Sequence, residues 1–334
     1  MKRFFLITPQ KSREKGGIQN WMYHTAKLLA EAGYDVSVYA YREERPAGYF
    51  EHFVCDALIL ATWKMALPLL PTLLVSKKDV FIFVHGNEIV DFSFFLKPLI
   101  DYLVRRKRTY FIANSNAVAD LFFEHFGRKV DLVQHPFLEI HTGSPAKRAK
   151  EKGKRFLTIS RLVKRKNIDT VIRAFAKLKE EGFDFLYEIG GTGPQRERLE
   201  RLVCELGLEE NVKFLGRLSE ERKAVCYEET DFFLLPSIYD RQNGSIEGYG
   251  IVYIEANMYG IPVLSGDTGG MVEAVIDGVT GLHSDGSIED VATKIVAMTR
   301  YPFDRRKILE HARGHDCRMQ NGFLDFIGGR LYGC

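Results

Sequence analysis

The sequence has few of the residues from which disulfide frameworks and metal centres are built. Its cysteines are few and widely spread, with no Cys-x-x-Cys pair and no Cys/His cluster at ligand spacing. They are Cys55, Cys204, Cys226, Cys317 and Cys334. The His-Glu-x-x-His and Asp-x-Asp patterns are also missing. We therefore expect reduced thiols, a cytoplasmic location, no metal and no other cofactor.

Long apolar runs are missing as well. The N-terminus carries only four consecutive apolar residues after its basic start, which is too few for a signal peptide. The most apolar stretch, residues 57–75, is interrupted by Lys64 and by two prolines. We therefore expect a strand, a loop and a helix in this stretch, and no membrane span.

A strong overall charge is absent too. The formal net charge is +3, which gives no reason to expect a nucleic-acid partner. The charge is unevenly distributed, because residues 1–150 carry 21 Lys and Arg against 15 Asp and Glu, whereas the remainder has a net charge of −3. A basic first half indicates an anionic partner on that side, such as a phosphorylated acceptor or a lipid surface. An ordinary solvated face is the alternative interpretation.

What the sequence does contain is a regular alternation of β-rich and helical stretches over 334 residues. In the first half we expect strands at residues 3–8, 35–41, 57–60, 80–84, 110–113 and 130–133, with helices at 18–32, 63–75, 93–107 and 116–126. In the second half we expect strands at residues 156–160, 185–190, 212–215, 232–235, 262–264 and 281–283, with helices at 168–181, 194–206, 220–227 and 288–299. Continuously apolar strands separated by helices predict parallel sheets covered on both faces.

A polar, strongly basic stretch at residues 140–155 interrupts this alternation and predicts a domain boundary. We expect an N-terminal α/β domain at 1–145, a C-terminal one at 154–305, and a helical tail at 306–334. The tail is expected to pack back on the first domain and to have its helix broken at Gly328 and Gly329. In open parallel sheets ligands bind beyond the carboxyl ends of the strands, so polar clusters after strands are the candidate site residues.

The most informative cluster holds Glu247 and Glu255, eight positions apart around a predicted helix start. Gly248 and Gly250 allow close approach of the backbone to a ligand, and the free N–H groups of the first helical turn favour an anion. A phosphate at the helix end, with carboxylates beside it for hydroxyl groups, would suit a sugar nucleotide. An ordinary acidic loop between a strand and a helix explains the spacing equally well.

Further clusters follow other predicted strands. Gly16 and Gly17 stand at a helix start within residues 11–20, where they suit a phosphate or a sugar oxygen but equally a plain turn. His85 follows a fully apolar strand and could hydrogen-bond a substrate, although a lone histidine is usually structural. Arg161 and Lys166 follow the first strand of the second half, where two cations could hold a diphosphate leaving group.

A glycine-rich turn at residues 190–194 suggests a nicotinamide cofactor only weakly. Arg196 stands where the Gly-x-Gly-x-x-Gly fingerprint requires its third glycine, and no Walker lysine pattern is present. An oxidoreductase is therefore a distant alternative.

Together these clusters resemble the retaining glycosyltransferases of GT-B fold in family 4, the glycosyl transferases group 1. The matching patterns are the Gly-Gly pair after the first strand, Ser-Arg-Leu-Val-x-x-Lys at 160–166, Gly-Gly-Thr-Gly-Pro at 190–194, Val-x-Phe-Leu-Gly at 212–216, Phe-Leu-Leu-Pro-Ser at 233–237, Glu-x7-Glu at 247–255 and Gly-Ile-Pro-Val at 260–263. The resemblance covers about residues 1–300 and is more specific in the second half. It implies an α/β fold of two Rossmann-like doubly wound parallel-sheet domains facing across a cleft.

The resemblance also implies a role for each cluster. Arg161 and Lys166 would bind the donor diphosphate and stabilise it as it leaves, Glu247 would bind hydroxyls of the transferred sugar, and Glu255 those of the ribose. His85 would hydrogen-bond the donor sugar near the reacting carbon. The implied catalytic residues are therefore Arg161, Lys166, Glu247 and His85. The implied donor-binding residues are Gly16, Gly17, Gly191, Gly193, Leu215, Gly248, Tyr249, Gly250, Ile251 and Glu255.

The function that the resemblance implies is transfer of a hexose-type sugar from a nucleoside diphosphate, with a UDP-sugar favoured as donor. The acceptor would be a hydroxyl of a glycan or glycolipid in cell-surface polysaccharide or lipopolysaccharide synthesis. The transfer would retain the anomeric configuration and would require no metal. The basic cluster of Lys97 and residues 105–108 adds a hypothesis of peripheral contact with an anionic membrane at its inner face. The segment 238–245 is longer than the family's usual segment before the first glutamate, so the identity of the donor sugar stays open. A GT-B nucleotide-sugar epimerase and a non-catalytic sugar-nucleotide-binding protein are the alternatives.

Overall fold

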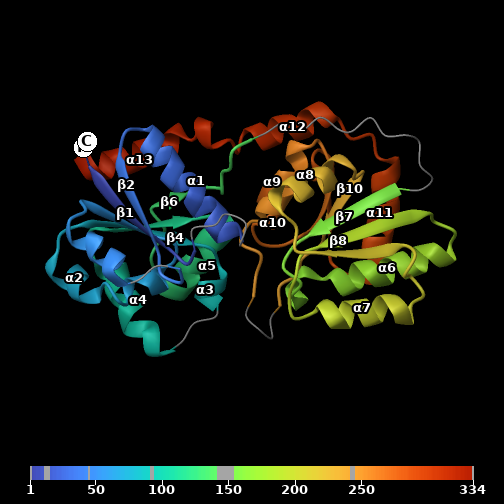
Figure 1. The fold of residues 1–334 in the computed structure, drawn as a ribbon, viewed down its shortest axis with the longest axis horizontal. Helices are drawn as coiled ribbons and strands as arrows, with labels where there is room; N and C mark the ends of the chain where they lie inside the picture. The colour runs from blue at the N-terminus through green and yellow to red at the C-terminus, as the bar shows by residue number, and fades with distance from the viewer. Residues whose placement is uncertain are drawn as a thin grey trace. The chain divides into compact units, whose positions relative to one another are not determined.

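The structure, a computed structural model, describes residues 2–10, 16–43, 46–90, 94–140, 154–240 and 245–332, leaving out the side chains of 46–49. The chain divides into two compact units. Unit 1 contains Met1–Glu139 together with His315–Cys334, and unit 2 contains Ile140–Gly314. In the colouring of Figure 1 the last helix of the chain therefore lies with the first strands.

Unit 1 is built on a six-stranded parallel sheet with the strand order β2-β1-β3-β4-β5-β6. The strands are β1 (Arg3–Thr8), β2 (Asp35–Ala40), β3 (Ala57–Leu60), β4 (Asp79–Val84), β5 (Thr109–Ala113) and β6 (Leu132–Val133). Strands β3 and β4 are buried throughout, and apart from Asp79 at the start of β4 they are entirely apolar, as strands covered by helices on both faces usually are.

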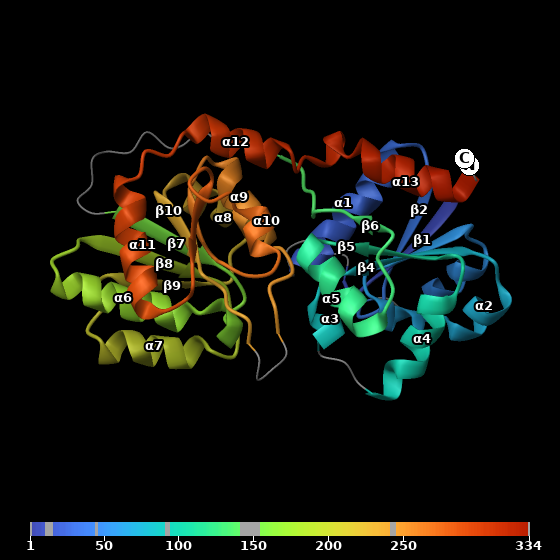
Figure 2. The same cartoon turned by 180° about the vertical axis from the view of Figure 1, so that it is seen from behind.

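Helices cover the two faces of this sheet. They are α1 (Gly17–Glu31), α2 (Leu70–Val75), α3 (Asn87–Val90), α4 (Lys97–Arg105), α5 (Asn116–Phe126) and α13 (Asn321–Tyr332), with 3-10 turns η2 (Pro46–Phe53), η3 (Trp63–Ala66), η4 (Phe94–Leu96) and η6 (Cys317–Met319). Figures 1 and 2 show α1 and α13 on one face and α2 and α4 on the other. The rings of Trp21 and Phe323 both pack against Phe83, with centroids 4.5 and 6.2 Å away. The C-terminal helix is therefore part of the unit 1 core.

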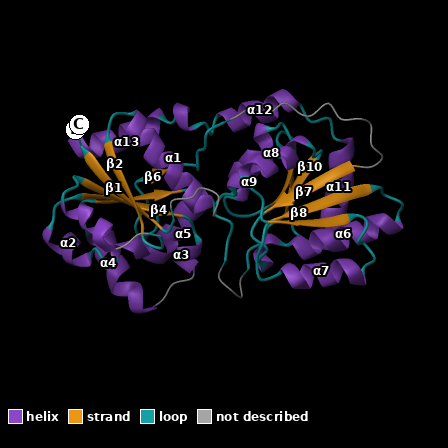
Figure 3. Cartoon of the chain, viewed as in Figure 1, coloured by secondary structure: helices purple, strands orange, loops and turns teal. Residues whose placement is uncertain are grey.

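Unit 2 has a second six-stranded parallel sheet, in the order β12-β11-β10-β7-β8-β9. The strands are β7 (Lys154–Ile159), β8 (Phe185–Gly190), β9 (Val212–Gly216), β10 (Phe232–Leu235), β11 (Val263–Gly266) and β12 (Gly281–Ser284). Counted within the unit, the order is the doubly wound 3-2-1-4-5-6 of dinucleotide-binding domains. Figure 3 shows the orange strands of both sheets between purple helices.

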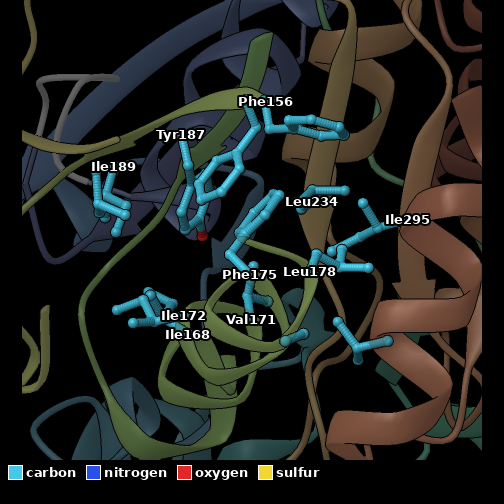
Figure 4. Close-up of a cluster of buried hydrophobic side chains, with 14 of the residues drawn as sticks. Phe156, Ile168, Val171, Ile172, Phe175, Leu178, Tyr187, Ile189, Leu234 and Ile295 are labelled. Atoms are coloured by element: carbon cyan, nitrogen blue, oxygen red, sulfur yellow. The ribbon is translucent and has the colours of Figure 1, made fainter. Parts of the chain in front are cut away.

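The helices of unit 2 also form two layers. They are α6 (Ile168–Glu180), α7 (Arg196–Glu205), α8 (Glu220–Glu228), α9 (Ile251–Met258), α10 (Met271–Ala274), α11 (Ile288–Arg300) and α12 (Arg305–Arg313), with the 3-10 turn η5 (Lys164–Lys166). One layer packs Phe175 of α6 against the rings of Phe185 and Tyr187, with centroids 4.2 and 5.1 Å away. Figure 4 shows this core, with Phe156 of β7 and Ile295 of α11 at its edge.

The predicted α/β class with two parallel sheets is confirmed, and the predicted strand bounds lie within two residues of those observed. Two expectations for the helices were wrong. The helix expected at residues 63–75 is divided into η3 and α2, since Pro68 stands between them and Pro71 lies in the first turn of α2. The expected break at Gly328 and Gly329 does not occur, because α13 continues to Tyr332 and Gly328 packs beside the Tyr34 hydroxyl.

No helix in the described part of the chain is both long and apolar enough to cross a membrane.

Candidate functional site

The strand order of unit 2 reverses between β7 and β10. These two strands are neighbours in the sheet, although β8 and β9 intervene in the sequence. The loops after β7 and β10 leave their carboxyl ends in opposite directions, which opens the crevice where doubly wound sheets bind ligands. The first loop carries residues 160–167 and the second leads to Glu247 and α9. The sequence therefore places both of its main clusters at this switch point.

The two loops meet in a cluster of buried charges. The guanidinium of Arg165 and the ammonium of Lys166 both donate hydrogen bonds to Oε2 of Glu247. All three side chains are largely buried, with exposed fractions of 15%, 8% and 11%. Because both cations hold the same oxygen, Oε1 of Glu247 is left available to accept from a ligand hydroxyl. The cluster brings Lys166 and Glu247 together, as a shared site requires.

Burial and charge act in opposite directions on these groups. Burial by itself would raise the pKa of Glu247, but the charges of Arg165 and Lys166 lower it to about 2. Burial lowers the pKa of the Lys166 ammonium, aided by the neighbouring Arg165, while Glu247 opposes that shift. We infer that the carboxylate stays ionised, because two cations contact one of its oxygens. The cluster then carries a net positive charge, which suits an anionic ligand.

The backbone after β7 is shaped so that Lys166 turns inward. Asn167 adopts a left-handed conformation with φ 55° between η5 and α6. Its Nδ2 donates to the carbonyl of Gly286 at 2.9 Å, and its Oδ1 accepts from Thr170 Oγ1 at 2.7 Å. These bonds offset the cost of a conformation that non-glycine residues rarely adopt. The carbonyl of Arg165 in turn accepts from the Ile238 amide at 2.8 Å, which joins the β7 loop to the β10 loop.

The start of α9 lies just beyond Glu247. Gly248, Tyr249 and Gly250 are buried, and Gly250 caps the helix at φ 92°. A Cβ on Gly250 would lie 2.2 Å from the Tyr253 ring, which is itself fixed by a 2.8 Å bond to the Leu235 carbonyl. Only glycine can therefore occupy this cap. The amides of half-buried Ile251 and Val252 are the N–H groups of the helix end without an intrahelical acceptor, whereas that of Tyr253 donates to the Gly250 carbonyl at 3.0 Å.

The carboxylate of Glu255 is held by a side chain of the adjacent helix α8. Its Oε2 accepts a hydrogen bond from the Tyr227 hydroxyl of α8 at 3.1 Å, and both residues are buried. Burial and the Glu255 charge raise the pKa of Tyr227 well above its ordinary value, so the phenol remains a donor. The ring of Tyr227 stacks on Tyr259 with centroids 5.2 Å apart. Glu255 thus has one oriented carboxylate oxygen and a second that can accept from a ligand.

The predicted glycine-rich donor loop has a structural reason for its composition. A Cβ on Gly191, which has φ 122°, would lie 1.9 Å from the Ser160 carbonyl oxygen, and one on Gly193 would lie 2.3 Å from that of Leu162. The β8 loop is therefore packed backbone to backbone against the β7 loop. Leu215 lies half-buried near the end of the edge strand β9. A direct donor contact for these three residues stays a prediction.

Two residues missed by sequence reasoning contact the predicted ones, and the predicted role of Arg161 stays a prediction. Arg165 contacts Glu247, whereas Arg161 is exposed. Both arginines stand in the same basic run, and no sequence pattern distinguishes them. Tyr227, the partner of Glu255, has no sequence signal, because its helix is separated from Glu255 by a strand and a loop.

The predicted residues of unit 1 lie at the carboxyl edge of its own sheet. Nε2 of buried His85 donates to the Ala61 carbonyl at 2.8 Å, since a carbonyl oxygen can only accept. Burial lowers the pKa of His85, so a neutral ring presents Nδ1 as an acceptor. Gly16 caps α1 and Gly17 begins it, and both are exposed. The basic residues 11–15 before them, and residues 241–244 before Glu247, lie outside the described residues.

Among the residues that the structure describes, no group of three or more His, Cys, Asp and Glu side chains is arranged to hold a metal ion.

The fold defines the class of protein. A solved structure of sucrose-phosphate synthase from Thermosynechococcus elongatus matches with a TM-score of 0.81 over 100% of both chains, at 16% identity. A crystal structure of Anabaena HepE in complex with UDP and glucose matches with a TM-score of 0.76 over 98% of this chain and 100% of the other, at 17% identity. Two six-stranded Rossmann-like sheets in this arrangement along the chain are the GT-B architecture.

The sequence profile of the glycosyl transferases group 1 matches residues 142–315, which is just over half of the chain. The chain belongs to this family. A GDP-mannose-dependent alpha-(1-6)-phosphatidylinositol monomannoside mannosyltransferase of Mycolicibacterium smegmatis is 38% identical over 138 residues, covering 41% of this chain. A putative colanic acid biosynthesis glycosyltransferase, WcaL, of Escherichia coli is 32% identical over 170 residues, covering 49%. The chain spans 36% and 41% of the length of these two relatives.

Proposed function

We propose that the protein transfers a hexose-type sugar from a nucleoside diphosphate sugar to a hydroxyl group of a glycan or glycolipid acceptor, with retention of configuration. The observation that carries this proposal is the buried cluster of Arg165, Lys166 and Glu247 beside the start of α9. It combines two cations, a free carboxylate oxygen and helix-end amides at a topological switch point. Those groups suit a ligand with a phosphate, a leaving charge and sugar hydroxyls.

The proposed mechanism relies on electrostatic stabilisation. As the glycosidic bond breaks, negative charge grows on the nucleoside diphosphate, and Lys166 with Arg165 would stabilise it from fixed positions. Oε1 of Glu247 would accept from a sugar hydroxyl, and the oriented carboxylate of Glu255 would accept from the ribose. Preorganised cations can offset the leaving charge without a metal, so we propose metal-independent transfer. Arg161, His85, Gly16 and Gly17 remain predicted participants.

Two lines of support point to different donors. The sequence prediction favours a UDP-hexose, and Anabaena HepE was crystallised with UDP and glucose. The mycobacterial relative is named for GDP-mannose and is twice as similar in sequence over its matched part. We therefore propose GDP-mannose as the first donor to test and a UDP-hexose as the second. The names of the relatives also support a lipid-linked or polysaccharide acceptor.

A thermal-shift screen tests donor binding directly. A ligand that binds only the folded protein raises the melting temperature by mass action, by an amount set by its concentration relative to Kd. We expect one of the UDP-, GDP-, ADP- and dTDP-sugars to raise it with EDTA present, and Glu255→Ala to reduce that shift. Glu205→Gln, on the exposed side of α7, serves as the control. No shift with any sugar nucleotide would overturn the proposal.

Product analysis separates the proposal from its alternatives. A transferase releases the free nucleotide and glycosylates an added acceptor, and NMR of the product gives the anomeric configuration. A GT-B epimerase would convert the donor to another sugar without any acceptor. A non-catalytic binding protein would shift the melting temperature and give no product with any acceptor.

A further inference from the structure

One helical layer of unit 1 exposes an unusual amount of apolar surface. Seven large apolar side chains among the described residues are more than 60% exposed, and six of them lie in or beside η2, α2 and η4. These six, which we call the apolar face, are Phe50, Val54, Leu74, Val75, Phe94 and Phe95. The seventh is Met319 in η6. Contiguous apolar surface on a protein normally marks an interaction site.

Hydrogen bonds hold the segments of this layer side by side. His52 of η2 pairs with Thr72 of α2 at 3.0 Å through Nε2 and Oγ1. The hydroxyl of Tyr102 in α4 donates to the carbonyl of Leu73 in α2 at 2.7 Å. Figures 1 and 2 both show α2 and α4 together on the face of the sheet away from α1 and α13. The exposed side chains therefore lie on neighbouring segments of one layer.

The surroundings of the apolar face are basic. Residues 64–108 contain eight Lys and Arg and four Asp and Glu, a net charge of +4. Two of the acids are already engaged, Asp79 with Arg108 at 2.5 Å and Asp101 with Lys97 at 3.3 Å. Lys77, Arg105 and Lys107 are exposed and form no ion pair with any described residue. Three uncompensated cations beside exposed Phe, Leu and Val complement an anionic lipid surface, with charges for headgroups and apolar side chains for the acyl boundary.

We propose that this layer docks the protein on an anionic lipid bilayer. Helices α2 and α4 run from the carboxyl end of one strand to the amino end of the next, so a bilayer against them would lie alongside the strands. The carboxyl edge of the sheet, where His85 lies, would then face along the membrane plane, close to the bilayer surface. Docking deepens the proposed function by naming how a lipid-linked acceptor is approached, but its test requires no turnover.

Vesicle co-sedimentation of the full chain tests the docking. We expect binding to vesicles of equimolar phosphatidylcholine and phosphatidylglycerol that weakens with salt, and much weaker binding to pure phosphatidylcholine. Lys77→Ala with Lys107→Ala should weaken binding roughly 30-fold, because each charge near the surface contributes about a fivefold factor. Leu74→Ser with Val75→Ser, and separately Phe94→Ser with Phe95→Ser, should reduce the bound fraction several-fold at high salt, where apolar contact dominates.

Met319→Ser is the matched control, because it removes an equally exposed apolar side chain outside the layer. We expect it to bind as the unmodified protein does. Every variant should keep its melting temperature and its thermal shift with the sugar nucleotide, so that loss of docking is distinguished from loss of the fold or of the proposed donor site. The proposal would be overturned if the protein failed to bind anionic vesicles, or if all the layer variants bound them as well as the unmodified protein. The apolar face would then be a surface for a protein partner.

Discussion

At the scale of single residues, the balance of charge around Glu247 is the central feature. One buried carboxylate faces two cations that come from adjacent positions, Arg165 and Lys166. Removing one partner of a buried ion pair leaves the other uncompensated, which costs far more than breaking a pair at the surface. In this cluster the second cation reduces that cost. The site is therefore built to tolerate an arriving anion that competes for Lys166.

Lys166→Ala should separate the catalytic role from the structural one. We expect turnover to fall by roughly 10²–10³-fold, the usual effect of removing one preorganised donor from a developing charge. Arg165 still neutralises Glu247, so the variant should fold. Steady-state kinetics with the donor found in the screen measures this effect, and Lys177→Ala on the exposed side of α6 is the control. Turnover within a few-fold of the unmodified value would contradict the assignment of Lys166.

Glu247→Gln should give a pH-dependent loss of stability. The folded-state pKa of about 2 lies below the value of about 4.3 for an unfolded chain, so ionised Glu247 stabilises the fold above the unfolded pKa. The shift corresponds to roughly 3 kcal/mol at pH 7. This contribution is lost as pH falls from about 4.3 through about 2. The difference in melting temperature between the variant and the unmodified protein should therefore narrow from pH 7 to pH 3. A difference that stays constant, or grows in acid, would show that Glu247 is not held by these cations.

At the scale of elements, loop packing decides where the site residues stand. The β7 loop that carries Lys166 is locked from one side by the β8 loop, where Ser160 and Leu162 receive the backbone of Gly191 and Gly193. From the other side the amide of Ile238 bonds to the carbonyl of Arg165. The glycines are thus required for backbone contact between loops, whatever they contribute to a donor. A side chain there would displace the whole loop and Lys166 with it.

Two glycine substitutions test this view in opposite directions. Gly191→Ala should lower the melting temperature by roughly 10 °C, because its Cβ would collide with the Ser160 carbonyl at a positive φ. Gly329→Ala should raise it by about 2 °C, because that glycine lies in the interior of α13 with nothing within 4 Å of an added Cβ. Differential scanning calorimetry measures both. Equal, small effects at the two positions would show that backbone packing does not determine the loop.

At the scale of the whole molecule, the first unit is discontinuous in sequence. The chain returns to it at His315, where the carbonyl accepts from the Leu138 amide at 3.0 Å. Beyond that point α13 lays Phe323 and Phe326 on Phe83 and Phe81 of β4, with centroids 6.2 Å apart in both pairs. The C-terminal segment therefore supplies part of one face of the unit 1 core. Unit 2 has no such dependence, since residues 140–314 are contiguous.

Fragments should reflect this difference. We expect residues 140–314 alone to unfold cooperatively and residues 1–139 alone to be unstable, because their sheet would expose the surface that α13 covers. Joining residue 139 to 315–334 through a short Gly/Ser linker should restore a cooperative transition, since the two ends are already adjacent. Circular dichroism during thermal unfolding measures all three. A fully cooperative 1–139 fragment would show that α13 is dispensable.

Local pattern was sufficient for most of the secondary structure. Strand β8 is mostly apolar, and Asn116–Phe126 begins after a serine cap and ends at a glycine, and both were predicted at their observed bounds. The order of motifs after the strands also led to the family and to Lys166, Glu247 and Glu255. Prediction failed where packing overrides local preference, as in α13, which continues through two glycines because Phe323 and Ile327 bury its face.

By itself, then, the sequence determined the α/β class, the two parallel sheets and the family of the chain, because periodicity and motif order are local properties written along it. Only the tertiary structure decided that Arg165 instead of Arg161 joins Lys166 on Glu247, and that Tyr227 orients Glu255. The direction of each side chain depends on a left-handed turn at Asn167 and on the packing of a neighbouring helix. Those contacts join residues 28 to 82 positions apart, and no local pattern records them.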